Sequence, residues 1–160
     1  MLQVKLICVG RMREKYYTEA FAEYAKRLGA YCRLECAEIA EVRLPDSPSD
    51  KEIAAALDRE GAEILKAIPA DAWVVALCVE GKALPSEGMA RLIADRENSG
   101  KPKLCFIVGG SCGLSAAVKE RADLRLSMSA MTFPHHLARV MLAEQIYRGF
   151  KINEGSKYHK

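Results

Sequence analysis

Leu104-Cys105-Phe106-Ile107-Val108-Gly109-Gly110-Ser111-Cys112-Gly113 joins a short apolar run to a glycine-rich turn. The run is typical of a strand that is buried on both faces, and a helical pattern begins soon after the turn, near Ser115. The glycines let a ligand approach the main chain closely. The Gly-x-Gly-x-x-Gly spacing of a dinucleotide site is missing, however, and a tight turn with only a structural role is the alternative.

The chain on both sides of this turn repeats the alternation of apolar runs and helical patterns. The predicted strands are Leu2–Val9, Cys32–Ile39, Trp73–Val79, Leu104–Val108 and Leu124–Ser127. The predicted helices are Glu14–Leu28, Lys51–Ile68, one that starts near Ser86, one from Ser115, and Pro134–Phe150 with Pro134 as its first residue. Such alternation predicts an α/β fold with a parallel sheet, in a single domain covering residues 1–160.

The composition excludes several classes of protein. Of the 160 residues, 50% are hydrophobic and 28% are charged, as in a folded globular protein and unlike a disordered chain. No apolar run approaches the ~20 residues of a membrane helix, and the first one is followed by basic residues too soon for a signal peptide. Cys8, Cys78 and Cys105 lie inside apolar runs and are expected to be buried, reduced thiols. We therefore expect a cytoplasmic protein with no membrane segment and no metal site.

The charge is unevenly distributed along the chain. The net charge is +3, and the segment from Arg139 to Lys160 alone carries five basic and two acidic residues. Arg11, Arg13 and Lys15 form a second basic cluster near the other end. Basic segments at both ends of a nearly neutral body indicate an anionic partner, although a solvated surface with excess lysine explains the charge equally well.

Ligands of parallel α/β sheets bind beyond the carboxyl ends of the strands, so the loops after Val79, Val108 and Ser127 are the candidates for a site. The loop from Ser127 to Pro134 mixes hydroxyl groups with large apolar side chains. That mixture suits an adenosine-like ligand with an aromatic part and polar edges. The alternative is that Met131 and Phe133 simply fill the core. Cys112 is a candidate nucleophile for which the sequence places no base.

The start of the final helix also carries candidate residues. His135 and His136 lie in its first turn, where the helix dipole lowers the pKa of a histidine. Arg139 lies on the same helical face as His135. Together with Tyr147 and Arg148, His135 and Arg139 are expected to form a basic surface beside the loop.

Several motifs together closely resemble the RlmH family. They are Phe106–Ser115, Leu126–His135, Glu144–Arg148 and the C-terminal Tyr158-His159-Lys160, and the resemblance covers the full chain. Members of that family are SPOUT-class methyltransferases that methylate N3 of a pseudouridine in 23S ribosomal RNA of the large subunit. The resemblance implies a parallel-sheet SPOUT fold with a C-terminal trefoil knot, S-adenosylmethionine as the cofactor, and action on assembled ribosomes or large subunits.

The resemblance also implies site residues and an assembly. The implied cofactor contacts are Leu77, Gly110, Ser129, Ala130, Met131, Thr132, Phe133 and Pro134. The candidate catalytic residues are His135, Arg139, Tyr158, His159 and Lys160, the last three in a tail that would reach the partner's site in a homodimer. An apolar stripe on the final helix is expected to form the dimer contact, and it consists of Leu137, Val140, Met141, Ile146 and Tyr147. Two other functions stay open: a non-enzymatic RNA- or ribosome-binding module, and a small-molecule enzyme of the nucleotide-binding type.

Overall fold

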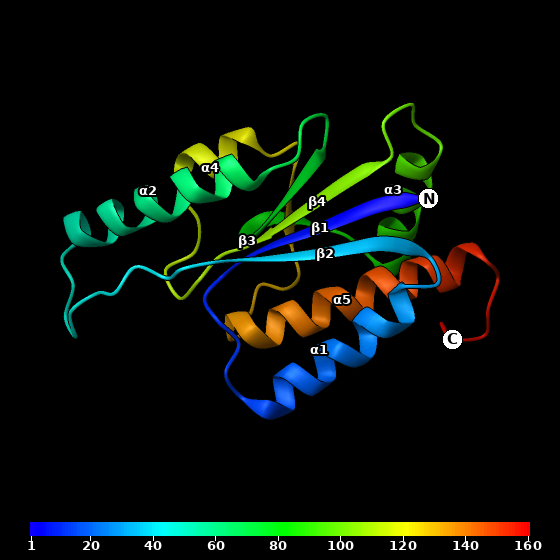
Figure 1. Ribbon diagram of the computed structural model, residues 1–160, viewed down its shortest axis with the longest axis horizontal. Coiled ribbons are helices and arrows are strands. Elements are labelled where there is room, and N and C mark those ends of the chain that lie inside the picture. The colour runs from blue at the N-terminus through cyan, green and yellow to red at the C-terminus, as the bar shows by residue number, and fades with distance from the viewer.

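A single five-stranded sheet forms the centre of the computed structural model, which describes residues 1–160 (Figure 1). Its strands are β1 (Leu2–Val9), β2 (Cys32–Ile39), β3 (Trp73–Ala83), β4 (Lys103–Val108) and β5 (Leu124–Ser127). The strand order is β2-β1-β4-β3-β5, and every neighbouring pair is parallel. The predicted α/β fold with a parallel sheet is therefore confirmed, and the trefoil knot stays a prediction.

Helices cover both faces of the sheet. They are α1 (Lys15–Leu28), α2 (Asp50–Ala67), α3 (Ser86–Glu97), α4 (Ala116–Arg121) and α5 (His135–Asn153). Helices α1, α3 and α5 lie on one face, and α2 and α4 lie on the other (Figure 1). None of these helices has the length and hydrophobicity to cross a bilayer.

The side chains of β1 explain why the central strands read as continuous apolar runs. Leu6 and Cys8 are buried in the core beneath α1, α3 and α5, whereas Ile7 and Val9 are buried in the core beneath α2 and α4. Successive side chains of a strand point to opposite faces, so a strand covered on both faces needs apolar residues at every position.

The ends of α5 differ from the prediction. Pro134 has φ −53° and ψ 136°, so it caps the helix, and the expectation that it is the first helical residue is wrong. The helix also continues three residues past Phe150 to Asn153, whose Nδ2 donates a hydrogen bond to the carbonyl of Ala90 in α3 at 2.9 Å. This contact with α3 adds a final turn that helical periodicity alone did not indicate.

The end of β3 departs from a regular ladder. Leu77 and Lys82 are both paired with Leu126 of β5, so the four residues between them bulge out of the sheet. A Cβ atom on Gly81 would lie only 2.7 Å from the carbonyl carbon of Arg125, so this close approach of two main chains requires glycine. The predicted strand end at Val79 is therefore wrong. The bulge also leaves Cys78 half-buried, unlike the expected core thiol.

Candidate functional site

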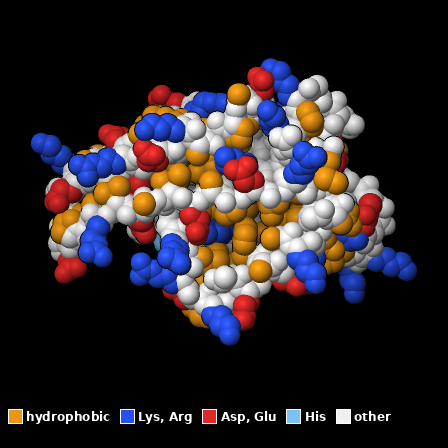
Figure 2. All heavy atoms as spheres, viewed as in Figure 1, with side chains coloured by type: hydrophobic (Ala, Val, Ile, Leu, Met, Phe, Trp, Pro, Cys, Tyr) orange, Lys and Arg blue, Asp and Glu red, His pale blue; other side chains and the backbone are white.

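A cavity of about 560 Å³ opens at the carboxyl ends of β3, β4 and β5. It is bounded by the predicted loops after β4 and β5 and by the bulged part of β3, where the sequence predicted a third loop after Val79. Its volume is in the usual range for small-molecule sites. All of the predicted cofactor residues except Ala130 line it: Leu77, Gly110, Ser129, Met131, Thr132, Phe133 and Pro134. Their contact with a cofactor stays a prediction. Hydrophobic side chains gather near the middle of the face shown in Figure 2, and Lys and Arg lie mostly toward its margin.

The glycine-rich turn after β4 has a structural role and also lines the cavity. The amide of Gly113 donates to the carbonyl of Gly110 at 3.1 Å, and a Cβ on Gly109 would lie 2.5 Å from the Gly113 carbonyl oxygen. A Cβ on Gly110 would lie 2.9 Å from Glu41 Oε1 and 3.1 Å from Val9 Cγ1. The position that a side chain of residue 110 would take is therefore occupied by the protein itself.

Two hydrogen bonds between near neighbours in the chain hold the loop between β5 and α5. Ser127 Oγ donates to the carbonyl of Ser129 at 3.1 Å, and Ser129 Oγ accepts from the amide of Met131 at 3.0 Å. The amides of Thr132 and Phe133 donate no hydrogen bond within the chain. Met131 is 74% exposed, so the alternative that it fills the core is wrong. The loop thus offers free main-chain donors beside large apolar side chains.

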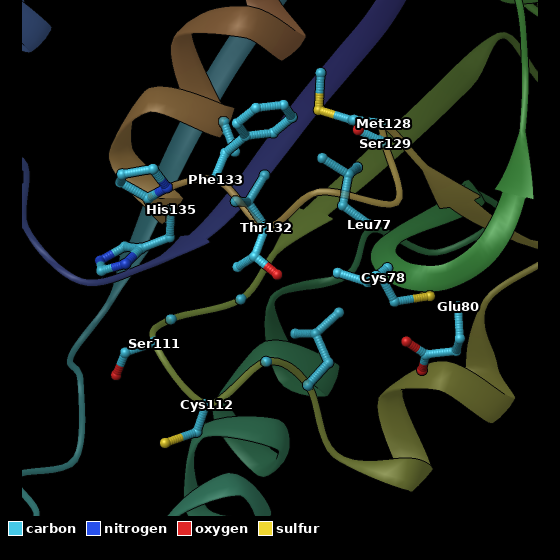
Figure 3. A pocket seen from close by; sticks show the side chains of 18 of the residues that line it. Leu77, Cys78, Glu80, Ser111, Cys112, Met128, Ser129, Thr132, Phe133 and His135 are labelled. Atoms are coloured by element: carbon cyan, nitrogen blue, oxygen red, sulfur yellow. The ribbon is translucent and has the colours of Figure 1, made fainter.

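The walls of the cavity differ in chemistry. Leu77, Met128 and Phe133 lie close together along one wall, and Ser111 and Cys112 stand at another edge with their side chains directed away (Figure 3). This orientation gives no support to Cys112 as a nucleophile.

Two further lining residues, Cys78 and Glu80, were missed by sequence reasoning because the bulge in β3 brings them to the cavity. The available signal was Glu80-Gly81-Lys82, which the sequence predicts as a turn and which the structure places within β3. A hydrogen bond from Lys119 lowers the pKa of Glu80. Burial raises the pKa of the Cys78 thiol.

His135 lies at the edge of the cavity in contact with His136, with 4.1 Å between the ring centroids. Burial is the main cause that lowers the pKa of His135, and the charge of neighbouring His136 adds to it. The prediction that the pKa of His135 is lowered is correct, but the main cause is burial and not the helix dipole. The Nε2 atoms of both rings are buried without a hydrogen-bond partner, and both lie close to Gly10.

Arg139 does not form part of a basic surface. Its side chain is 3% exposed, its Nη2 donates to the carbonyl of Gly10 at 2.8 Å, and its Nη1 donates to Glu38 Oε2 at 2.7 Å. The face that it shares with His135 turns toward the ends of β1 and β2, so the expectation of an exposed cation here is wrong. Arg139 instead ties the start of α5 to these two strands.

The C-terminal tail packs against α5 and α3. Tyr158 Oη donates to Glu144 Oε1 at 3.2 Å. His159 Nδ1 lies 3.2 Å from Arg148 Nη1, and its Nε2 lies 3.0 Å from Glu87 Oε1. Arg148 can only donate, so Nδ1 accepts and the Nε2 proton is directed at Glu87.

The tail is well separated from the cavity of its own chain. Arg148 is thirteen residues along α5 from His135, which is roughly 20 Å at the helical rise. Neither Arg148 nor Tyr158, His159 or Lys160 lines the cavity. One chain therefore does not bring the predicted catalytic residues together.

The lining fits an adenosine-containing cofactor, since it offers an apolar wall for a ring and free amides for polar edges. No group of three or more His, Cys, Asp and Glu side chains is placed to hold a metal ion. The cavity lies beyond the carboxyl ends of a parallel sheet, which is the ligand-binding position of the α/β class of proteins.

Comparisons with known proteins narrow this class. Residues 2–159 match the family model described as "Predicted SPOUT methyltransferase". A solved probable methyltransferase from Bordetella pertussis shares the fold, with a TM-score of 0.59 at 14% identity over 92% of this chain and 94% of that one. A probable methylase family protein from Haemophilus influenzae has a TM-score of 0.55 at 15% identity, over 100% of this chain and 72% of that one. The chain is therefore a methyltransferase of the SPOUT class.

The full-length relatives identify the family within that class. The chain is 45% identical to ribosomal RNA large subunit methyltransferase H from Bacillus pumilus, over 99% of this chain and 100% of the relative. It is 48% identical, with the same coverage of both chains, to the protein of that name from Bifidobacterium adolescentis. The chain belongs to the ribosomal RNA large subunit methyltransferase H family.

Proposed function

We propose that this protein transfers a methyl group from S-adenosylmethionine to N3 of a pseudouridine in 23S ribosomal RNA, on assembled ribosomes or large subunits in the cytoplasm. The names of its relatives support large-subunit ribosomal RNA as the substrate. The family resemblance supports the pseudouridine. The observation that carries the proposal is the cavity of about 560 Å³, which has an apolar wall and free amides in the loop before α5.

Transfer to N3 requires removal of a proton. S-adenosylmethionine supplies a methyl group on a sulfonium, and the nucleophile must present a lone pair in line with it. N3 of pseudouridine is an imide nitrogen that carries a proton. His135 lines the cavity, and its lowered pKa keeps the imidazole neutral near pH 7, so we assign it the role of proton acceptor. Arg139 acts as a positioning residue, because it fixes the start of α5 and with it the ring of His135.

A homodimer would complete the site. Within α5, Val140 and Ile146 are buried in the chain's own core, whereas Leu137, Met141 and Tyr147 are only half-buried and remain for a contact between protomers. We place the tail of one protomer beside the cavity of the other. Tyr158, His159 and Lys160 would then stabilise the anion that forms when N3 loses its proton.

Calorimetry with three ligands tests the cofactor. We expect S-adenosylmethionine to bind and ATP and NAD to give no comparable heat. An RNA-binding module without a cofactor would show no heat with any of them, and a general nucleotide enzyme would prefer ATP or NAD. Transfer of a labelled methyl group to purified large subunits then tests the substrate, with free ribosomal RNA as the comparison.

A further inference from the structure

The segment between β1 and α1 exposes basic and aromatic side chains together. Arg11 and Arg13 are exposed and form no ion pair, while Lys15 is paired with Glu19. Tyr16 is 66% exposed, and its ring packs edge-on against Tyr17 with 4.5 Å between centroids. Tyr16 is thus one of the few large apolar side chains of the molecule that the core does not cover.

One hydrogen bond and one close polar contact hold this segment in place. The amide of Met12 donates to Glu38 Oε2 at 3.2 Å, and Glu14 Oε2 lies 3.6 Å from His136 Nδ1. Gly10, just before the segment, is close to His135, because a Cβ on Gly10 would lie 3.4 Å from His135 Nε2. Figure 1 shows the chain passing from β1 to α1 beside the start of α5. Residues 11–16 do not line the cavity themselves, but the start of the segment lies close to His135, which does.

We propose that the segment Arg11–Tyr16 binds single-stranded RNA next to the reacting nucleotide. Tyr16 stacks on an unpaired base, and Arg11 and Arg13 contact phosphates. This inference rests on the proposed function and adds to it the residues that hold the RNA.

Single-stranded RNA fits this segment for two physical reasons. An enzyme that reacts at the pairing edge of a base needs that base unstacked, which leaves its neighbours unpaired and available to an aromatic ring. The acid that interacts with the charge of Arg11 is Glu38, and its carboxylate is already bound by Arg139 and by the amide of Met12. Both guanidinium groups are therefore available to phosphates.

The stacking role is tested by Tyr16→Ala and Tyr16→Phe in the full-length protein, with purified large subunits as substrate. Loss of a base–aromatic stack predicts a rise in KM for the subunits of about tenfold or more with alanine. Phenylalanine keeps the ring and should retain a KM close to wild type. The affinity for S-adenosylmethionine and the thermal midpoint should stay unchanged in both variants, because Tyr16 is exposed and outside the cavity lining.

The phosphate role is tested by the double variant Arg11→Gln/Arg13→Gln. The slope of log affinity for large subunits against log salt should decrease by about 0.7 for each arginine removed. The control Lys51→Gln/Arg59→Gln removes the same charge from exposed positions of α2 and should leave the slope unchanged.

Four results would overturn the inference. The first is wild-type KM in Tyr16→Ala while the wild type methylates large subunits, which rejects the stack and leaves the proposed function intact. The second is an unchanged salt slope in the arginine variant, and the third is an equal loss of slope in the α2 control. The fourth is absence of methyl transfer by the wild type, which rejects the proposed function as well.

Discussion

Arg139 Nη1 lies 2.7 Å from Glu38 Oε2, and this ion pair joins the start of α5 to the end of β2. The arginine is 3% exposed, whereas the carboxylate is 42% exposed. Partial burial acts to raise the pKa of Glu38, but hydrogen bonds from Arg139 and from the Met12 amide prevail, and the pKa is lowered. Because the same guanidinium also binds the carbonyl of Gly10, three segments at the edge of the cavity meet at one side chain.

Replacing Arg139 by methionine should destabilise the protein without adding bulk. The Gly10 carbonyl and the Glu38 carboxylate both lose a charged donor, so the free energy of unfolding should fall by roughly 2–3 kcal/mol. Urea denaturation measures this free energy of unfolding. Arg91→Met on the exposed side of α3 removes an unpaired cation and is the matched control. Equal urea midpoints for the two variants would show that the ion pair between Arg139 and Glu38 does not stabilise the protein.

The pKa of His135 predicts how stability depends on pH. Burial lowers this pKa in the folded state, so the unfolded chain, with a pKa near about 6.5, binds the proton more tightly. The contribution of His135 to stability is therefore complete above about pH 6.5 and is lost as the pH falls below that value. His135→Gln should flatten this part of the profile. Parallel profiles of unfolding free energy for the wild type and the variant would contradict the assignment.

Gly110→Val should weaken cofactor binding by moving the glycine-rich turn. The new Cβ would lie 2.9 Å from Glu41 Oε1 and 3.1 Å from Val9 Cγ1, so the turn has to shift. We expect the affinity for S-adenosylmethionine to fall about tenfold or more. Gly100→Ala is the control, because a Cβ there has no neighbour within 4 Å. A loss of stability as large as the loss of binding would make the turn purely structural.

Deleting Tyr158–Lys160 should leave cofactor binding nearly intact and remove methylation of large subunits. The tail lies outside the cavity of its own chain, so its proposed action is on the partner. Mixing this truncated chain with Gly110→Val chains creates heterodimers in which the cavity of one protomer is intact and the tail comes from the other. When S-adenosylmethionine is too dilute to occupy the Gly110→Val cavity, such mixtures should regain activity that neither variant has alone. Heterodimers that form and remain inactive would rule out the tail's action in trans.

The sequence predicted most of the fold because its signals are local. The bounds of β1, β2 and β5 agree with the prediction, since covered strands show as apolar or alternating runs between clear breaks. The bulge in β3 was not predictable, because it depends on pairing between Leu77, Lys82 and Leu126, which are far apart in the chain.

The sequence predicted the parts of the candidate site in which a motif determines the course of the main chain. It did not predict the side chains whose position depends on distant hydrogen-bond partners. The glycine-rich turn and the loop before α5 line the cavity as expected. Helical spacing placed Arg139 on the face of His135, but it carried no information that Glu38 and Gly10 would bury the arginine. The position of Tyr158 likewise depends on its hydrogen bond to Glu144, which lies 14 residues earlier in the chain.

Mass-spectrometric mapping of 23S ribosomal RNA tests the proposed methylation of N3 of a pseudouridine. Large subunits from cells that lack this protein are compared before and after incubation with the purified enzyme and S-adenosylmethionine. We expect a single pseudouridine to gain one methyl group, located on N3 by fragmentation, and this nucleoside to be present in wild-type cells. Identical RNA before and after incubation, or a methyl group on another base or another atom, would contradict it.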